Sequence, residues 1–355
     1  MMRNVSEAPR LRLGAAAAVM IVAAALQADV ILRFDGAKLD RITVRSATYE
    51  QVEYSLAGIS RPQRVPADQV EKIIYAGQRE LQSARALQAQ SAWLKAAEAF
   101  ARVASGGEEP YAEAGAFGEA ESFAWYFFET GQDGPRAKEK LDGYLKAYTP
   151  KKGFHVPFAL YLAGRVELLL GNKAQAGSRF QELAGLPGNS RRLLAELGKG
   201  ELQLAQGDAQ GAAITFNTAM NQAKRLNMGT LYRMAVAWRG RALVAEKDYQ
   251  RAIDFLEGYL KGGGEKIIFD RATAQASNAL GDAYAGKGGT ESQWEALYRY
   301  LWTTVLFRNW RAECAEAFYK AAQLAKALGV QADAEKLLQR LKSDFPETVW
   351  ARKVK

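Results

Sequence analysis

The sequence predicts a mainly α-helical protein, an α-solenoid of helical hairpins preceded by a small all-β module. A phrase at Gly171–Phe180 recurs at Gly207–Phe216 and, more loosely, at Lys247–Leu256. The copies begin 36 (207 − 171) and 40 (247 − 207) residues apart, a spacing typical of stacked helix pairs. Alanine is frequent after residue 84 and only 9 residues are proline, which favours helix. Ahead of this array, residues 29–75 alternate apolar and polar side chains with the period of two of β-strands.

Residues 1–28 have the pattern of a secretory signal peptide. Arg3, Arg10 and Arg12 precede the apolar run Leu13–Leu26, and the segment ends at Ala28. The run has about 14 residues, fewer than the ~20 that a membrane-spanning helix needs. We therefore expect cleavage after Ala28 and a periplasmic or secreted protein, with no stable membrane span after cleavage. The alternative is an uncleaved segment that stays as an anchor.

Residues 29–76 are expected to form the β module. Asp35-Gly36 is a turn signal, and Pro66–Asp68 is expected to be a single helical turn. Closing short strands into a small barrel removes their exposed edges. The alternating pattern predicts strands at Val30–Phe34, Leu39–Arg45, Tyr49–Leu56, Arg64–Val65 and Val70–Tyr75.

The order of these predicted strands along the sequence resembles that of the SH3-like barrels of the Sm type. Sm proteins often bind RNA, but the predicted signal peptide argues against an RNA partner for this chain. The stacking residues of the Sm family are also not identifiable here. We therefore favour a module that caps the helical array or docks on it.

Residues 77–355 repeat a pattern of small and large residues. In one unit Gly164 precedes Gly171 by seven residues, and Phe180 follows; Gly200 and Phe216 hold the same places in the next unit. Two helices cross closely only where side chains are small, and a large apolar residue then fills the gap beside the crossing. This arrangement resembles the tetratricopeptide repeat (TPR) from about Trp93 to Lys355. We expect about six helix pairs, and a neighbouring class of helical hairpin remains open.

The TPR resemblance implies a concave groove, lined by the first helix of each pair, that takes an extended peptide or a partner helix. The residue directly after each crossing glycine is expected to point into it, and so is the residue three before. The alternative is that Arg165 with Glu201, and Arg241 with Asp282, are ion pairs between adjacent repeats. The candidate partner contacts are Tyr161, Arg165, Glu201, Arg241, Asn278 and Asp282.

Two segments are dense in aromatic residues. The first is Phe123–Phe128, and the second runs from Trp294 to Trp310 and includes Tyr298 and Trp302. We expect both to be mainly core, with an exposed docking patch as the alternative.

No motif for catalysis, cofactor binding or metal binding is present. The single cysteine, Cys314, excludes an intrachain disulfide and a multi-cysteine zinc site, and we expect it to be buried. The single histidine, His155, has no histidine, cysteine or acidic cluster near it in sequence and is expected to be hydrogen-bonded in a turn between repeats. We therefore expect no enzyme activity, no catalytic, cofactor or metal residues, and no cofactor.

The formal charge of +9 is spread along the chain. Lys151-Lys152 and Arg191-Arg192 are pairs and not the basic stripe of a nucleic-acid-binding protein. We expect no nucleic-acid partner, while weak contact with an anionic envelope surface stays open. The function expected is a non-catalytic adaptor for proteins in the bacterial cell envelope. The alternatives are a cell-wall or polysaccharide binder and a non-catalytic subunit of an envelope enzyme complex.

Overall fold

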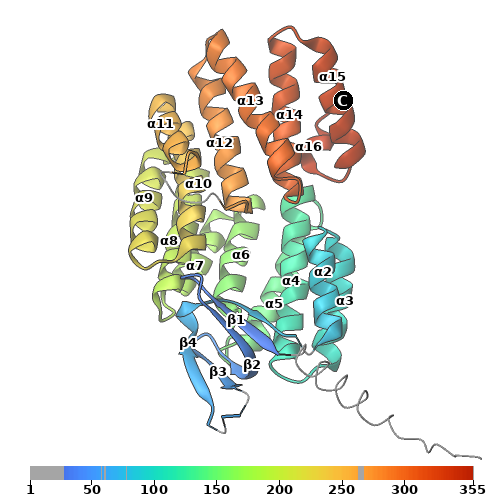
Figure 1. The fold of residues 1–355 in the computed structure, drawn as a ribbon, viewed down its shortest axis with the longest axis vertical. Helices are drawn as coiled ribbons and strands as arrows, with labels where there is room; N and C mark the ends of the chain where they lie inside the picture. The colour runs from blue at the N-terminus through green and yellow to red at the C-terminus, as the bar shows by residue number, and fades with distance from the viewer. Residues whose placement is uncertain (1–27, 57, 60, 77, 263–267, 355) are drawn as a thin grey trace, which may run out of the picture.

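In the computed structural model the described residues form fifteen α-helices in a solenoid-like array, preceded by a five-stranded antiparallel sheet (Figure 1). It describes residues 28–354 apart from 57, 60, 77 and 263–267. The predicted fold class is therefore confirmed. The predicted signal peptide lies outside the described residues, apart from Ala28. Among the described helices, none is both long and apolar enough to cross a bilayer.

The sheet has the strand order β4-β3-β2-β1-β5. The two outermost strands, β4 and β5, are joined by the short 3₁₀ turn η1 (Ala67–Gln69), close to where the sequence predicts a helical turn. The register shifts once where β2 pairs with β1 and once where it pairs with β3. Such β-bulges bend a strand and increase its twist. The strands are β1 (Asp29–Arg33), β2 (Lys38–Ala47), β3 (Gln51–Leu56), β4 (Gln63–Pro66) and β5 (Val70–Ile74).

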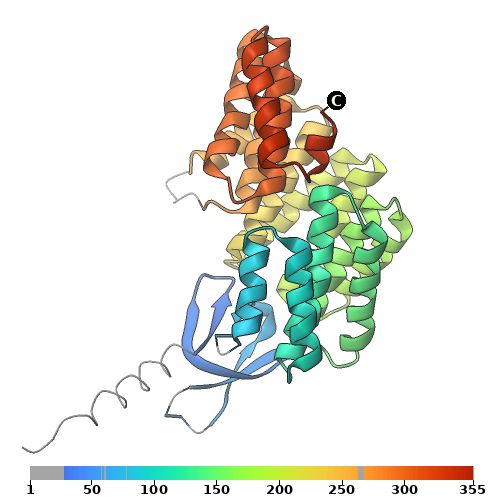
Figure 2. The ribbon, with the colours of Figure 1, turned by 90° about the vertical axis from the view of Figure 1, so that its right-hand side faces the viewer.

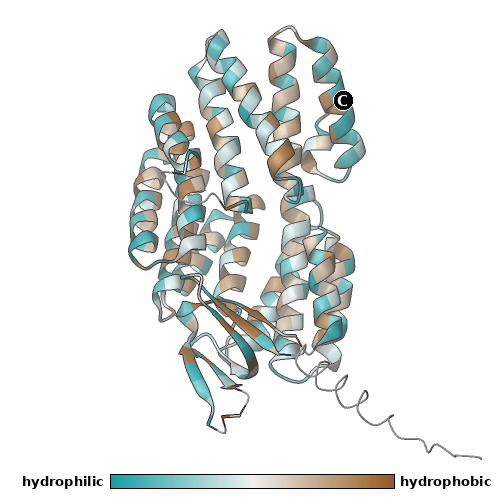
Figure 3. Cartoon of the chain, viewed as in Figure 1, coloured by the Kyte–Doolittle hydropathy of each residue, from teal (hydrophilic) through white to brown (hydrophobic). Residues whose placement is uncertain are grey.

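The helices from α2 to α15 form seven successive pairs, one more than the six expected, and a short helix follows them. Most helices carry both hydrophilic and hydrophobic residues along their length (Figure 3), as amphipathic helices do. The helices are α2 (Arg79–Ala89), α3 (Trp93–Gly106), α4 (Tyr111–Thr130), α5 (Gly134–Tyr148), α6 (Val156–Leu169), α7 (Lys173–Ala184), α8 (Asn189–Gln206), α9 (Ala209–Arg225), α10 (Gly229–Ala245), α11 (Tyr249–Leu260), α12 (Arg271–Lys287), α13 (Thr290–Leu306), α14 (Arg311–Ala327), α15 (Gln331–Asp344) and α16 (Val349–Arg352).

Glycines set the close crossings within the pairs. A Cβ atom at Gly164 of α6 would stand 2.3 Å from Cε1 of Phe180 on α7, and one at Gly200 of α8 would stand 2.4 Å from Cε1 of Phe216 on α9. Both distances are far inside van der Waals contact. The ring of the second helix therefore occupies the space that a side chain on the first helix would need.

The β module packs against the array in two places. Its apolar face shares one hydrophobic cluster with α2 and α3, through residues such as Leu81 and Phe100. Its turns meet the starts of two later helices: the amide of Gly229 donates to the carbonyl of Phe34 at 3.1 Å, and the amide of Asn189 donates to Asp68 at 3.3 Å. The sheet thus caps the end of the molecule opposite the C-terminal helices (Figures 1 and 2).

The first helices of the pairs form the inside of the curved array. Each of α4, α6, α8, α10 and α12 also packs against the first helix of the next pair. The curvature brings α4 below α14 in Figure 1, and the two helices touch. We call the surface formed by α4, α6, α8, α10, α12 and α14 the inner face.

Candidate partner-binding surfaces

Three of the predicted groove residues meet on the inner face between α6 and α8. The guanidinium of Arg165 donates from Nε to Glu201 at 2.9 Å, and the hydroxyl of Tyr161 donates to the other carboxylate oxygen at 2.5 Å. Tyr161 is 4% exposed and Glu201 is 6% exposed. Burial, together with the neighbouring carboxylate, holds the pKa of the Tyr161 hydroxyl well above its ordinary value. The ion pair between repeats that the sequence offered as an alternative is therefore present here.

Aromatic rings cover most of this pair, and the Arg165 side chain stays 18% exposed. The Arg165 guanidinium lies 4.7 Å from the ring centre of Phe128 on α4 and 5.8 Å from that of Trp238 on α10. A cation held over several rings is stabilised by their quadrupoles when it is desolvated. The inner face at α4, α6, α8 and α10 is thus largely filled by an aromatic and ionic cluster.

The other three predicted residues lie further along the inner face and are brought together by α14. Arg241 stands 3.7 Å from Glu316, and Asp282 accepts from the ammonium of Lys320 at 2.7 Å. Asn278 donates to the backbone carbonyl of Glu313 at 2.9 Å. Arg241 is therefore paired with α14 and not with Asp282.

Sequence reasoning missed Glu316 and Lys320. A signal for Lys320 was available, because it follows Asp282 by 38 residues (320 − 282), within the repeat spacing. Lys320 on α14 therefore continues the alternation of positive and negative side chains along the first helices of the pairs. We call Arg241, Asp282 and Lys320 the C-terminal inner row. Their side chains are 28%, 26% and 24% exposed, so this part of the inner face is open to solvent.

A closing contact joins α4 to α12 and α14. Arg271 donates to Glu129 at 3.0 Å, and its guanidinium lies 3.8 Å from the ring centre of Trp125. Glu129 also accepts from the indole of Trp93 at 2.6 Å. Burial raises the pKa of Glu129, although Arg271 opposes that rise. Residues 142 positions apart in sequence thus hold the curvature of the array.

His155 has a carboxylate partner that the sequence did not indicate. Glu113, at the start of α4, accepts from the His155 amide at 3.0 Å and lies 2.8 Å from its Nδ1. The expected hydrogen-bonded histidine between repeats is present, at the turn before α6. The carboxylate is not near His155 in the sequence, because it comes from the preceding helix pair. Cys314 is buried as expected, and burial raises the pKa of its thiol to about 12.

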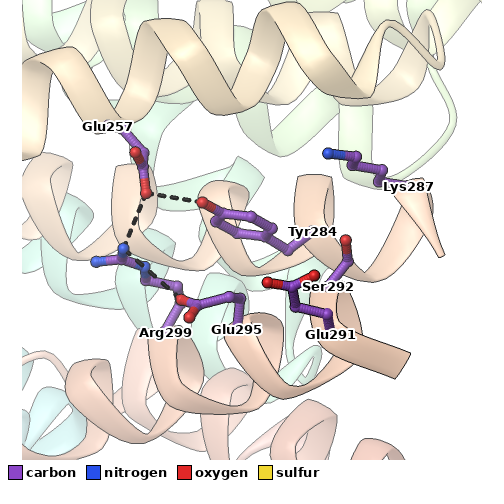
Figure 4. A pocket seen from close by; sticks show the side chains of 7 residues that line it. All are labelled: Glu257, Tyr284, Lys287, Glu291, Ser292, Glu295 and Arg299. Carbon is purple, nitrogen blue, oxygen red and sulfur yellow. Dashed lines mark hydrogen bonds and ion pairs between the residues drawn. The ribbon is translucent and has the colours of Figure 1, made fainter. Parts of the chain in front are cut away.

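A polar cavity of about 400 Å³ lies among α11, α12 and α13 (Figure 4). Glu257 accepts from the hydroxyl of Tyr284 at 2.7 Å and from Arg299 at 2.9 Å. Glu291 and Glu295 line the same cavity, so its charge is mixed. The described residues contain no group of three or more His, Cys, Asp or Glu side chains able to hold a metal ion.

The second aromatic segment divides between core and surface. Tyr300 and Phe307 are 3% and 4% exposed, as the core expectation requires. Tyr298 and Trp302 are 53% and 59% exposed, so the expectation is wrong for them. They point away from α12 and α14 because they lie on the opposite face of α13 from Tyr300.

We call the exposed apolar residues of this face the α13 stripe. It consists of Tyr298, Trp302, Val305 and Leu306, which are 53%, 59%, 67% and 42% exposed. Ile268 and Phe269, ahead of α12, are also exposed, and the ring of Phe269 lies 5.7 Å from that of Phe307 at the end of α13.

Comparison with known proteins gives structural neighbours alone. No family model matches the chain, and no curated protein matches it. Among solved structures, the TPR-like repeats of a putative kinesin light chain from Podosopora anserina are 15% identical, with a TM-score of 0.40, over 52% of this chain and 92% of that one. The TPR domain of P58(IPK) is 14% identical, with a TM-score of 0.27, over 77% of this chain and 76% of that one.

These neighbours are described as TPR or TPR-like proteins. The assignment of this chain as an α-solenoid of TPR-like hairpins rests on its own seven helix pairs.

Proposed function

We propose that the chain is an exported, non-catalytic scaffold of the bacterial cell envelope that binds another protein along the C-terminal inner row. The observation that carries the proposal is the difference in exposure along the inner face. The C-terminal inner row keeps about a quarter of its side-chain surface open, whereas the side chains of Arg165 and Glu201 keep 18% and 5%. A partner that enters the curve of the array therefore has more side-chain surface to contact in the first group than in the second.

The charge of this row suits a polypeptide. Arg241 and Lys320 are cationic, and Asp282 and Glu316 stand between them as anions. Alternating charges offer donors and acceptors to a peptide backbone and to side chains of both signs. A nucleic acid would meet carboxylates along the same path, which repel its phosphates. The proposal therefore includes no nucleic acid and no cofactor.

Site-directed crosslinking tests this proposal. A photo-reactive amino acid placed at Arg241 is expected to capture a protein partner in envelope extracts. The matched control is the same substitution at Arg251, a 60% exposed position on α11, outside the inner face. Equal capture at both positions, or capture at Arg251 alone, contradicts the proposal. The identity of the captured protein decides whether this chain is an adaptor or a subunit of an enzyme complex.

Export is the second part of the proposal, and it rests on the pattern of residues 1–28. Fractionation of cells followed by amino-terminal sequencing is expected to find a periplasmic or secreted chain that begins at Asp29. A cytoplasmic chain that retains Arg3 contradicts it.

Polysaccharide binding is a second candidate function, favoured by the exposed rings of Tyr298 and Trp302. Exposed aromatic rings are able to stack on sugars, but Val305 and Leu306 beside them offer nothing polar. Sedimentation with purified peptidoglycan tests this candidate. Binding that Trp302→Ser abolishes supports it, and no sedimentation with the unsubstituted chain removes it.

A further inference from the structure

The exposed face of α13 has an uneven distribution of charge along its length. At 100° per residue, Glu291, Glu295, Tyr298, Trp302 and Val305 fall within one narrow sector of the helix. The acidic residues occupy the start of this sector and the apolar residues occupy its end. Arg308, which is exposed, follows just beyond the helix. The face is thus acidic and then apolar, and an exposed arginine follows the helix in the sequence.

Other second helices of the array do not share this apolar stripe. On α11 the exposed positions include Gln250, Arg251 and Asp254, and on α9 a single large apolar residue, Ile214, is exposed among polar ones. Single exposed apolar residues are normal on a protein surface and need no partner. Four neighbouring exposed apolar residues on a single helix face form a patch, and exposed apolar patches mark interaction sites.

We propose that the α13 stripe is the contact surface between two copies of this chain, with the two α13 helices packed antiparallel across a two-fold axis near Trp302. In this arrangement the apolar segment of one copy covers the apolar segment of the other. The proposal is independent of the partner on the inner face. Each surface can therefore fail without the other.

The exposed area of the α13 stripe is similar to the nonpolar area that one partner buries in an ordinary dimer interface. The exposed fractions of the α13 stripe correspond to roughly 450 Å² of surface per copy. A standard interface buries about 800 Å² per partner, of which about 60% is nonpolar, or roughly 480 Å². The stripe alone thus supplies the apolar part, and Ile268 with Phe269 lie beyond its end.

The charges agree with an antiparallel arrangement. With the axis at Trp302, residue 295 of one copy lies opposite residue 309 of the other, since 295 + 309 = 2 × 302. The Glu295 carboxylate, whose side chain is 45% exposed, then lies beside the partner copy's exposed arginine at position 308. A parallel arrangement would place the acidic starts of both helices together, and like charges repel. An anionic membrane is also disfavoured, because Glu291 and Glu295 share the face that would touch it.

The size of the purified chain in solution tests the proposal. Light scattering after gel filtration, and sedimentation over a concentration series, are expected to show a dimer. Trp302→Ser is expected to weaken it by roughly 30-fold or more, as large central aromatic residues do at interfaces. The matched control is Ile214→Ser, which alters an equally exposed apolar residue on α9 and is expected to leave the dimer intact. A monomer for the unsubstituted chain, or a dimer that withstands Trp302→Ser, overturns the proposal.

A charge exchange tests the antiparallel arrangement. Glu295→Arg and Arg308→Glu are each expected to weaken the dimer, and the doubly substituted chain is expected to regain it, because the pair re-forms with reversed signs. Failure of the double substitution to restore what each single one loses overturns the antiparallel arrangement. Monomeric chain that sediments with anionic vesicles and loses this binding on Trp302→Ser assigns the stripe to a membrane surface and overturns the dimer.

Discussion

The inner face between α6 and α10 and the outer face of α13 invert the usual distribution of polarity. Inside, Arg165 and Glu201 are charged and enclosed by aromatic rings. Outside, Trp302 and Val305 are apolar and more than half exposed. Chemical type therefore does not separate structural residues from binding residues in this array. What separates them is how much of each side chain the neighbouring helices leave exposed.

The two faces have different energetic consequences. A buried charge is tolerable only while its counter-charge and hydrogen bonds remain, so the inner pair is sensitive to the loss of either member. An exposed apolar side chain costs little in the folded monomer and releases free energy only when another surface covers it. Substitutions inside are therefore expected to act on folding, and substitutions outside on association.

The largest effect is expected from Arg165→Leu. The substitution leaves the Glu201 carboxylate buried with the hydroxyl of Tyr161 and without its cation. Breaking one member of a buried ion pair costs about 3 kcal/mol or more of the free energy of unfolding. Urea denaturation monitored by circular dichroism measures the loss.

A second substitution separates the stranded charge from lost packing. Glu201→Gln in the Arg165→Leu background removes the charge and keeps an oxygen that accepts from Tyr161. The double variant is expected to recover at least half of the lost free energy of unfolding. A double variant no more stable than Arg165→Leu alone would show that packing of the arginine against the rings, and not its charge, carries the effect.

Much of the fold is predictable from local patterns. The crossing glycines such as Gly164 and Gly200 are identifiable because they recur with the repeat, and the strands are identifiable from their period of two. The closing contact of Glu129 with Arg271 is not predictable in this way, since 142 residues separate the partners. Their meeting depends on the summed curvature of all the pairs between them.

The candidate surfaces were less predictable than the fold. The predicted groove residues do lie on the inner face, but the sequence does not show that Tyr161, Glu201 and Asn278 are buried there. The α13 stripe was missed for a related reason. This helix is apolar on two faces, one with Tyr300 and one with Trp302, and periodicity alone does not tell which face packs against the array.

Two valines, one buried and one exposed, are expected to give an effect of intermediate size on the free energy of unfolding. Val166 on α6 is 0% exposed and Val305 on α13 is 67% exposed. Val166→Ala is expected to lower the free energy of unfolding by about 2 kcal/mol through two lost methyl groups and the cavity they leave. Val305→Ala is expected to raise it by up to about 0.5 kcal/mol, because alanine has the better helix propensity. Urea denaturation at low protein concentration measures both, and a loss at Val305 as large as that at Val166 contradicts the exposure of the stripe.

The smallest effect is expected from the pH dependence of Glu316, which pairs with Arg241 and Lys320 of the C-terminal inner row. Burial acts to raise the pKa of Glu316, but Lys320 and Arg241 outweigh it and hold that pKa below its ordinary value of 4.5. Because the folded-state pKa is the lower one, the carboxylate stabilises the fold above about pH 4.5, and this contribution is lost as the pH falls through the folded-state pKa.

Glu316→Gln is therefore expected to flatten the decline of the urea midpoint below pH 4.5. Glu335→Gln, at an exposed position on α15, is the matched control and is expected to keep the decline of the unsubstituted chain. A Glu316→Gln variant that declines as steeply as the control would mean that Lys320 relies on Asp282 alone. In that case the charges of the row contribute little to the free energy of unfolding. Substitutions there would then affect partner binding more than folding, unlike substitutions of the largely buried pair of Arg165 and Glu201.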